Sequence, residues 1–445
     1  MTLRFSILSN IVNILIINIM ISVIADVPIY AQPAPIPFHK EPYSLESGIH
    51  EGLMTESVIA FRKVIQIDGA PWLQIHFSDY NLGTQSYIQI TSLKDGGSQR
   101  FDTKNLPLWG NSTAYFNGDA VVIELHVAPG EDGIFFSISE ITVGKQGGVI
   151  TESICGTTDD RVPSIDPAVG RIVPVGCTGW IVSNGALLTA GHCNDGIMGL
   201  LQFNVPDSNS NGSINNPPPE DQYPIDQNSI IFNNGGIGND WAIFRTFTNT
   251  NTNQLPVERQ GAFYRASREA PLPFFSNVRI TGYGADMGTS NQTEQTHVGI
   301  YNGEGQNGNN FWHGYGVDTT GGNSGSPIIW EGSSFIIGIH TTGGCDTGYE
   351  NRGTSFEHDP LDNTLQNFPG TNTVYVDTVF QPPGWWPFWV ETGSIFQPYN
   401  TVTEAVNVIP NGGIVSIVAG SYPEAITINK AVSIIAPVGA VTIGQ

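Results

Sequence analysis

The chain has 445 residues and carries 17 Lys and Arg against 40 Asp and Glu, which gives a formal net charge of -23. Such an acidic chain repels nucleic acid and anionic membranes, so neither is expected as a partner. The 52 glycines and 29 prolines indicate a loop-rich β protein, and the length predicts two or three domains.

Residues 1–31 have the pattern of a targeting segment. Arg4 supplies a positive charge, residues 11–24 are apolar apart from two asparagines and a serine, and a polar, proline-rich stretch follows Ala31. This pattern predicts a signal peptide cut after Ala31, and hence a secreted, extracellular protein with no membrane association after cleavage. An uncleaved anchor is the alternative, since about 20 apolar residues can span a bilayer. The interior asparagines and the small residue at the exit favour cleavage.

Residues 33–150 predict a small antiparallel β-sandwich. Turn clusters separate runs in which apolar and polar residues alternate as they do in strands. These runs are Val58–Ile67, Trp72–Phe77, Tyr87–Ser92, Ala120–Val127 and Ile134–Ile141. The proline-rich stretch 33–55 fits either a linker or a first edge strand. An accessory binding module, a folding pro-domain and a spacer are the competing roles for this domain, and the accessory module is favoured.

Residues 153–380 predict a second all-β domain. Short apolar runs recur between turns, and few helical patterns appear. The runs are Gly179–Val182, Ala186–Leu188, Trp241–Arg245, Val278–Gly282, Ser326–Trp330 and Phe335–His340. Many short strands of this kind are typical of a β-barrel or of a pair of barrels.

Residues 388–445 differ from both preceding domains. Thr401 and Glu404 make a capping box that predicts a short helix ending near Val408. Strand-like pieces joined by turns at 420–423 and 437–439 come next, and they are Ile414–Val418, Ile426–Ile428, Val432–Ile435 and Val441–Ile443. The stretch resembles the opening cap and first coils of a right-handed parallel β-helix.

The resemblance to a β-helix rests on residues 422–428 and 436–443. A solenoid needs at least three repeats and a covered end, yet this pattern stops at Gln445 in mid-repeat. Either a partner covers the open end or the reading frame is truncated. Many β-helix proteins act on polysaccharides, but Glu404 and Glu424 are the only acidic residues after position 391. No catalytic cluster of carboxylates is visible, so the segment is interpreted as structural.

The stretch Thr319–Pro327, Thr-Thr-Gly-Gly-Asn-Ser-Gly-Ser-Pro, predicts a tight turn around Ser324. Gly322 and Ser324 are two residues apart, so their N–H groups can face one concavity and hold an oxyanion. The apolar run that follows predicts a buried strand supporting the turn. A reactive serine in such a place suits acyl transfer, whereas a Gly/Ser loop without chemistry is the alternative.

Two further motifs supply a base and a carboxylate. His192 follows one apolar strand-like run, and Asp240 stands at the head of another. Taken alone, the histidine would be interpreted as structural and the aspartate as a cap or turn residue. The order His192, Asp240, Ser324 is one of the known orders of a catalytic triad, and the three motifs together favour catalysis.

The cysteines are Cys155, Cys177, Cys193 and Cys345, all in the central region, and no Cys-x-x-Cys pair suggests zinc. In an oxidising compartment two disulfides are expected, with three pairings open and free buried thiols as the alternative. Because Cys193 follows His192, a Cys177–Cys193 bridge would fix the imidazole. A Cys155–Cys345 bridge then follows by elimination.

The motifs Thr-Ala-Gly-His-Cys, Asn-Asp-Trp-Ala and Gly-Asn-Ser-Gly-Ser-Pro resemble the trypsin/chymotrypsin-like serine endopeptidases. More narrowly, residues 153–380 are similar to bacterial glutamyl endopeptidases in four stretches, which are Thr158–Arg161, Cys177–Trp180, Thr319–Pro327 and Ile337–His340. The resemblance implies two six-stranded β-barrels with the site in the cleft between them. It also implies protein or peptide substrates and no cofactor or metal in the reaction. The excess of Asp and Glu is compatible with a structural calcium ion, although no calcium-loop signature appears.

The resemblance further implies the residues of the substrate pocket. His340 matches the glutamate-reading histidine of the family, Thr319 adds a hydroxyl, Thr341 belongs to the same wall, and Gly343 keeps the pocket open. An imidazole in a half-buried pocket can pair with a substrate carboxylate, whereas a core histidine bonded to a backbone carbonyl is the alternative. Cys345 and both flanking domains depart from the glutamyl endopeptidases, so cleavage at other residues is a second hypothesis.

A protease-like fold used as a binding scaffold is the competing class of function. Loss of a triad residue would favour it, and the sequence retains all three. The bond between Glu152 and Ser153 follows a glutamate at the domain boundary, where the resemblance begins, and this predicts that the enzyme cuts itself there. Cleavage would free an amino terminus near Ser153, which the resemblance places against the specificity pocket. The alternative is that residues 33–150 form a permanent module.

Overall fold

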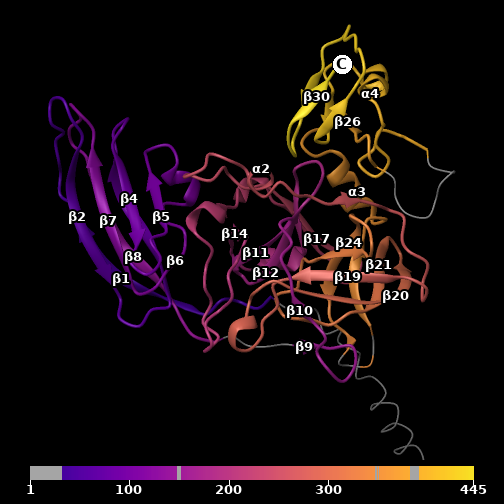
Figure 1. Ribbon diagram of the computed structural model, residues 1–445, viewed down its shortest axis with the longest axis horizontal. Helices are drawn as coiled ribbons and strands as arrows, with labels where there is room; N and C mark the ends of the chain where they lie inside the picture. The colour runs from indigo at the N-terminus through magenta and orange to yellow at the C-terminus, as the bar shows by residue number, and fades with distance from the viewer. Residues whose placement is uncertain (1–32, 148–151, 346–347, 349, 381–389, 445) are drawn as a thin grey trace, which may run out of the picture.

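The computed structural model describes residues 33–147, 152–345, 348, 350–380 and 390–444 (Figure 1). The predicted signal peptide, residues 1–31, lies outside these ranges. Strands dominate the described residues, and the α-helices among them are short, namely α2 (Pro256–Gln260), α3 (Asp359–Gln366) and α4 (Val402–Val408). The predicted all-β class is therefore confirmed. No helix within the described ranges is long and apolar enough to cross a membrane.

Residues 38–144 fold into two four-stranded antiparallel sheets around one hydrophobic core, drawn in indigo and violet in Figure 1. The orders are β1-β8-β3-β6 and β2-β7-β4-β5. The strands are β1 (Phe38–Glu46), β2 (Val58–Gln66), β3 (Trp72–Asn81), β4 (Tyr87–Ser92), β5 (Ser98–Phe101), β6 (Phe116–Asn117), β7 (Ala120–Val127) and β8 (Phe135–Gly144). Val121, Ile123, Leu125 and Val127 all enter the core because side chains two apart share a face. The stretch 33–55 contributes the edge strand β1.

The interior of the sandwich continues into the next part of the chain. Val173, Leu200 and Ile214 belong to the same cluster of buried apolar residues as the sandwich core. Beside them, the Gln222 side chain accepts a hydrogen bond from the N–H of Tyr115 at 3.0 Å and donates one to its carbonyl at 2.9 Å. The sandwich and the barrel region are therefore joined by both apolar packing and buried hydrogen bonds.

Residues 162–355 form two barrel-like sheets, which gives the chymotrypsin-like fold (Figure 1). The first has the order β15-β14-β11-β12-β13-β17-β16. Its strands are β11 (Val169–Pro174), β12 (Cys177–Ile181), β13 (Leu187–Thr189), β14 (Met198–Gln202), β15 (Gln222–Pro224), β16 (Ile231–Asn234) and β17 (Asp240–Phe244). The expected count of six strands is wrong for this sheet, because the short strand β15 adds a seventh at its edge.

The second sheet has the order β10-β20-β19-β23-β24-β25-β21, with β18 beside β24. Its strands are β10 (Val162–Pro163), β18 (Arg265–Ala266), β19 (Asn277–Gly282), β20 (Gln295–Asn307), β21 (Asn310–Gly316), β23 (Pro327–Trp330), β24 (Phe335–Thr342) and β25 (Asn351–Ser355). Pairing of β20 with β21 closes a ring of six strands, to which the two-residue strands β10 and β18 are added.

The C-terminal part pairs its strands in parallel. Strands β26 (Thr373–Val376), β27 (Ile414–Ile417) and β29 (Ser433–Ile435) form one sheet, and β28 (Gly420–Tyr422) pairs with β30 (Val441–Ile443). Parallel pairing of successive coils is consistent with a β-helix, which stays a prediction. The first of these strands, β26, falls within the predicted range 153–380 but pairs with the C-terminal part.

Two details of the C-terminal prediction are wrong. Residues 426–428 form no strand, and Gly420–Tyr422, expected to be a turn, is the strand β28. The Glu424 carboxylate accepts hydrogen bonds from the N–H groups of Val402 and Thr403 at the start of α4. The chain after Tyr422 is therefore drawn toward the helix instead of continuing in the sheet. At the same helix, the predicted cap is present, because the N–H of Glu404 donates to the Thr401 hydroxyl at 3.2 Å.

Candidate active site

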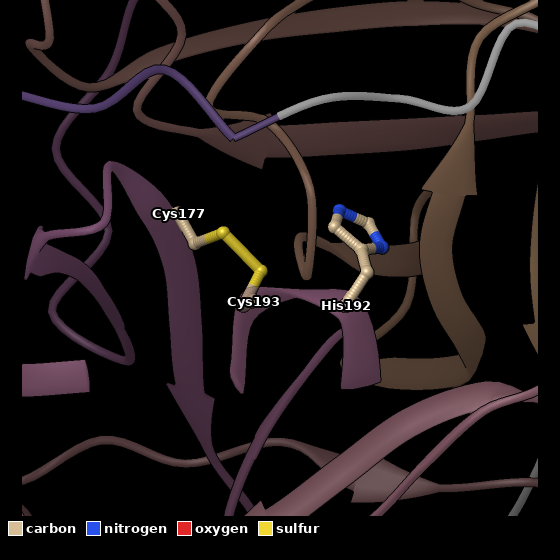
Figure 2. Close-up of side chains that lie close together, drawn as sticks. All are labelled: Cys177, His192 and Cys193. Atoms are coloured by element: carbon tan, nitrogen blue, oxygen red, sulfur yellow. A yellow bond between two sulfur atoms is a disulfide. The ribbon is translucent and has the colours of Figure 1, made fainter. Parts of the chain in front are cut away.

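His192 lies in a short 3₁₀ turn, η2 (Gly191–Asp195), that follows β13. Only glycine fits at position 191, because a Cβ there would lie 1.9 Å from the Asn233 carbonyl oxygen. The next residue, Cys193, is bonded to Cys177 at the start of β12, as Figure 2 shows. The disulfide thus ties the histidine turn to a buried strand, which is the pairing expected from the sequence.

Asp240 holds the histidine at two points. Its Oδ2 lies 2.6 Å from Nδ1 of His192, and its Oδ1 accepts a hydrogen bond from the His192 backbone N–H at 2.9 Å. The carboxylate is itself buried at the head of β17, where Thr354 bonds both the backbone N–H and the carbonyl of Asp240. The imidazole is therefore fixed with Nε2 as its remaining nitrogen.

Ser324 lies on a glycine turn that is fitted closely to its surroundings. Gly322 and Gly325 have φ angles of +99° and +89°, and a Cβ on them would lie 2.5 Å from the Tyr283 carbonyl oxygen and 2.1 Å from the Thr189 hydroxyl. Thr178 of β12 donates its N–H to the Ser324 carbonyl at 2.9 Å. The turn is thus fixed by glycine geometry and by direct contact with the first sheet.

Several polar groups around Ser324 are left without partners. The Oγ of Ser324 and Nε2 of His192 are both buried, and neither has a hydrogen-bond partner. Among the described residues, the N–H groups of Asn323 and Gly325 have backbone acceptors, whereas those of Gly322 and Ser324 have none. Buried polar groups usually find partners, so this concentration of open donors and acceptors indicates a site prepared for a ligand.

His340 is fully buried in β24, in the second barrel-like sheet. Its Nδ1 lies 2.6 Å from the hydroxyl of Tyr315 in β21, and its Nε2 is buried without a partner. Burial, with a smaller contribution from the nearby His192, lowers the pKa of His340 to about 3. The imidazole is therefore neutral at physiological pH and has one nitrogen free.

Two other predicted pocket residues, Thr319 and Thr341, are also buried. Thr319 is buried in β22 (Thr319–Thr320), and its hydroxyl accepts a hydrogen bond from the Asn351 amide at 3.1 Å. Thr341 is buried next to His340, with its hydroxyl 3.3 Å from that of Thr342. The hydroxyl groups of Thr319 and Thr341 are thus already hydrogen-bonded to neighbouring side chains.

The space beside Gly343 is filled by Ser153. A Cβ on Gly343 would lie 2.9 Å from the Cβ of Ser153, so this glycine accommodates a packed side chain. The Ser153 hydroxyl donates to the Asn351 carboxamide oxygen and accepts from the N–H of Gly344 at 2.9 Å. Residues 152–153 form β9, which pairs with β22, and the Cys155–Cys345 disulfide lies close by. The start of the domain is therefore anchored at the predicted pocket.

Sequence reasoning missed three residues of this site, namely Thr178, Tyr315 and Asn351. Each contributes a hydrogen bond across a large separation in the chain, and only Thr178 lies in one of the stretches that carry the resemblance. Ser153 was expected near the specificity pocket only as the start of a cleaved chain, whereas it lies beside Gly343 in the uncut chain. Burial in Asn310–Gly316 does not alternate, so the strand gave no local sign that Tyr315 contacts His340.

Residues 167–356 match the protein-family model Trypsin. These residues form a trypsin-like serine protease domain. The trypsin-like domain contains His192, Asp240, Ser324 and His340. No curated protein matches the chain.

Three solved structures are similar to part of this chain. A thermostable serine protease AL20 from an extremophilic microorganism is 16% identical, and the match covers 44% of this chain and 98% of that one, with a TM-score of 0.34. Mouse neuropsin is 17% identical, with coverages of 44% and 91% and a TM-score of 0.32. Human heparin binding protein is 15% identical, with coverages of 48% and 98% and a TM-score of 0.33.

Two groups of side chains among the described residues have the spacing of metal ligands. Cys177, His192 and Cys193 make one, but its two sulfurs are joined in a disulfide. Asp160, His297 and Asp318 make the other, in which the Asp318 carboxylate already accepts the N–H groups of Cys155 and Asp160. Because the two sulfurs of the first group and the Asp318 carboxylate of the second are engaged within the protein, neither group is assigned to a metal.

Proposed function

We propose that this protein is a serine endopeptidase that hydrolyses peptide bonds with Ser324, His192 and Asp240. One observation carries the proposal, which is the pair of hydrogen bonds by which Asp240 holds both the ring and the backbone of His192. They leave Nε2 as the nitrogen that can take a proton from Ser324. A buried, unpartnered serine hydroxyl on the neighbouring glycine turn supplies the nucleophile.

The reaction follows from these positions. His192 Nε2 removes the proton from Ser324 Oγ as the oxygen attacks the substrate carbonyl, and Asp240 stabilises the imidazolium that forms. His192 then gives this proton to the leaving amine, which breaks the peptide bond and leaves an acyl-enzyme. Water, activated by the same imidazole, hydrolyses the ester and restores the serine.

The open N–H groups of Gly322 and Ser324 are the proposed oxyanion hole. They alternate with N–H groups that are already bonded, so two donors remain available at one side of the turn. A developing oxyanion on the substrate would receive both hydrogen bonds. Preorganised donors of this kind are typically worth about 3 kcal/mol each in transition-state stabilisation.

We further propose that the enzyme cuts after glutamate. His340 presents a buried nitrogen without a partner, and its Nδ1 lies 2.6 Å from the Tyr315 hydroxyl. We assign the hydroxyl as the donor of this hydrogen bond, which places the ring proton on Nε2. An N–H in that position pairs with a carboxylate and offers nothing to a lysine or arginine. Aspartate is the expected second choice, because its carboxylate is similar but its side chain is shorter. The substrates are secreted or extracellular proteins and peptides, in keeping with the predicted signal peptide.

Cleavage of a peptide library, followed by mass spectrometry of the new termini, tests this function. The expected result is new carboxyl termini that end in glutamate. Ser324→Ala should remove all of them. Ser326→Ala is the matched control, since this buried serine stands in the same loop and its hydroxyl also lacks a partner. Equal products from wild type and Ser324→Ala would disprove the catalytic assignment, and termini without glutamate would disprove only the specificity.

A further inference from the structure

The first described residues of the chain lie as an extended strand on the trypsin-like domain. The N–H of Ala34 donates to the Gly176 carbonyl and that of Ile36 to the Pro174 carbonyl, both at 2.9 Å. Ala34 and Ile36 are buried, whereas Pro35 between them is exposed. The neighbouring positions 33, 35 and 37 are prolines, which have no N–H to donate. Between residues 33 and 37, backbone N–H groups are therefore present only at Ala34 and Ile36, the two residues that donate to the carbonyls of Gly176 and Pro174.

A connection between two strands of the second barrel-like sheet also holds this strand. Gln292, in the connection from β19 to β20, donates its side-chain N–H to the Ala34 carbonyl at 2.8 Å. Gln292 is 3% exposed and has a φ of +55°, a backbone conformation that residues other than glycine rarely adopt. Such strain is found where a side chain must be held for a purpose. Ala34 is thus bonded both by the turn between β11 and β12 of the first sheet and by the connection between β19 and β20 of the second.

This strand lies next to the catalytic groups. Gly176 precedes Cys177, whose disulfide partner adjoins His192, and Thr178 is bonded to the Ser324 carbonyl. In the view of Figure 2 the indigo N-terminal stretch runs above Cys177. Gly176 itself cannot be replaced, because a Cβ there would lie 1.8 Å from the Ala34 carbonyl oxygen.

The position of this contact indicates which part of a substrate it would meet. Strand β12 contacts Ser324, because the Thr178 N–H donates to the Ser324 carbonyl. Strand β24 contacts the following residue, because the Gly325 N–H donates to the His340 carbonyl. If the His340 pocket takes the residue before the cut bond, the edge at Pro174–Gly176 receives the residues after it. An extended peptide adds to such an edge by backbone hydrogen bonds at alternate residues, as Ala34 and Ile36 do.

We propose that residues 33–36 are a built-in inhibitory strand that occupies the leaving-group side of the cleft. The proposal rests on the function proposed above. A substrate that extends past the cut bond must displace this strand, whereas one that ends close to the bond does not. The edge carbonyls of Pro174 and Gly176, together with the Gln292 amide, form the binding strip for which strand and substrate compete.

Two substrates with the same residues before the cut bond test the competition. The short one ends in a small fluorogenic amine, and the long one is a quenched peptide with four residues after the bond. Ala34→Arg places a charge at a buried position and should expel the strand. It should lower KM for the long peptide roughly tenfold and leave the kinetics of the short substrate unchanged. Pro35→Arg adds the same charge at the exposed neighbour and should change neither.

A second variant and a binding measurement complete the test. Ala34→Pro removes only the N–H that donates to Gly176, and it should lower KM for the long peptide roughly fivefold. Unchanged KM for the long peptide in folded Ala34→Arg and Ala34→Pro would overturn the proposal, as would equal changes for both substrates. If no variant cuts either substrate, the proposed catalytic function fails. Fluorescence anisotropy then measures the affinity of the long peptide for the Ser324→Ala protein with and without Ala34→Arg. Tighter binding to the double variant would show the competition without any catalysis, and equal binding would overturn it.

Discussion

The hydroxyl of Tyr315 lies 2.6 Å from Nδ1 of His340, and this contact leaves Nε2 as the only free nitrogen of a fully buried imidazole. A histidine whose two nitrogens are both bonded would serve only the packing of the core. His313 in β21, which β25 separates from β24, is of that kind, because its nitrogens contact the Tyr301 hydroxyl and the Ile337 carbonyl. The difference between the two histidines is what makes His340 the candidate for reading a substrate side chain.

Replacing His340 by Val should lower kcat/KM on glutamyl peptides by roughly 100-fold, because a buried carboxylate would lose a charge-assisted hydrogen bond. Peptides with an apolar residue before the cut should lose much less. Parallel assays on two peptides that differ only at that residue measure the ratio. Equal losses on both peptides would mean that His340 only packs the core.

Replacing Tyr315 by Phe should reproduce part of this effect. The ring stays in place, but Nδ1 of His340 loses its donor and the proton is no longer directed to Nε2. We expect a roughly tenfold loss on glutamyl peptides and little change on apolar ones. Tyr301→Phe, which removes the equivalent hydroxyl beside His313, is the matched control and should leave the ratio of the two rates unchanged.

Ser324→Ala and His192→Ala should each reduce kcat by roughly 10⁴-fold or more, and the double variant should be no worse than either, because the groups act as a unit. Single-turnover assays with an ester substrate measure the loss of rate in the two single variants and in the double variant. Circular dichroism and thermal melting would show that each variant keeps the fold. Additive losses in the double variant would argue against a shared proton-transfer step.

His340 should also make the fold sensitive to acid. Its pKa is lowered to about 3, so the folded state keeps it neutral while the unfolded chain binds a proton below the ordinary value of 6.5. Its contribution to stability is full above pH 6.5 and is lost as the pH falls toward 3, at about 1.4 kcal/mol per pH unit. His340→Gln should therefore flatten the dependence of unfolding free energy on pH by one proton between pH 6 and 4. An identical slope in denaturant titrations of both proteins would contradict this.

Self-processing between Glu152 and Ser153 stays a prediction. Glu152 is exposed, but both residues pair with β22, so this short pairing must open before another copy of the enzyme can cut the bond. N-terminal sequencing of the secreted protein should find Ser153 in wild type and not in Ser324→Ala. Glu152→Gln, with an intact active site, should remain uncut if glutamate is required. A chain beginning near Gln32 in fully active wild type would exclude the hypothesis.

Local sequence predicted the features that depend on neighbouring residues. Strands such as Tyr87–Ser92 and Ala120–Val127 were found with their bounds because alternation with a period of two is visible within a few residues. His192, Asp240 and Ser324 were singled out because each has its own motif, and the structure brings His192 and Asp240 into contact. The strand β28 was missed because Gly420 and Ser421 have low strand propensity, and only pairing with a later coil makes them extended.

The rest of the site depends on contacts that no local pattern encodes. Tyr315 meets His340 because β21 and β24 both pair with β25. Ala34 meets Gly176 and Gln292 only when both sheets are in place. Each partner lies far away in the chain, so physical reasoning about single segments could not have joined them.

The two hydrogen bonds between Gln222 and Tyr115 bear on what a cut at Glu152 would produce. Both disulfides lie after that bond, so no covalent link would remain between the two fragments. The sandwich would nevertheless keep its buried amide contacts and its share of the apolar interior with Val173 and Leu200. The mature molecule would then be a two-chain enzyme held together without covalent bonds, and its subunits would separate only under denaturing conditions.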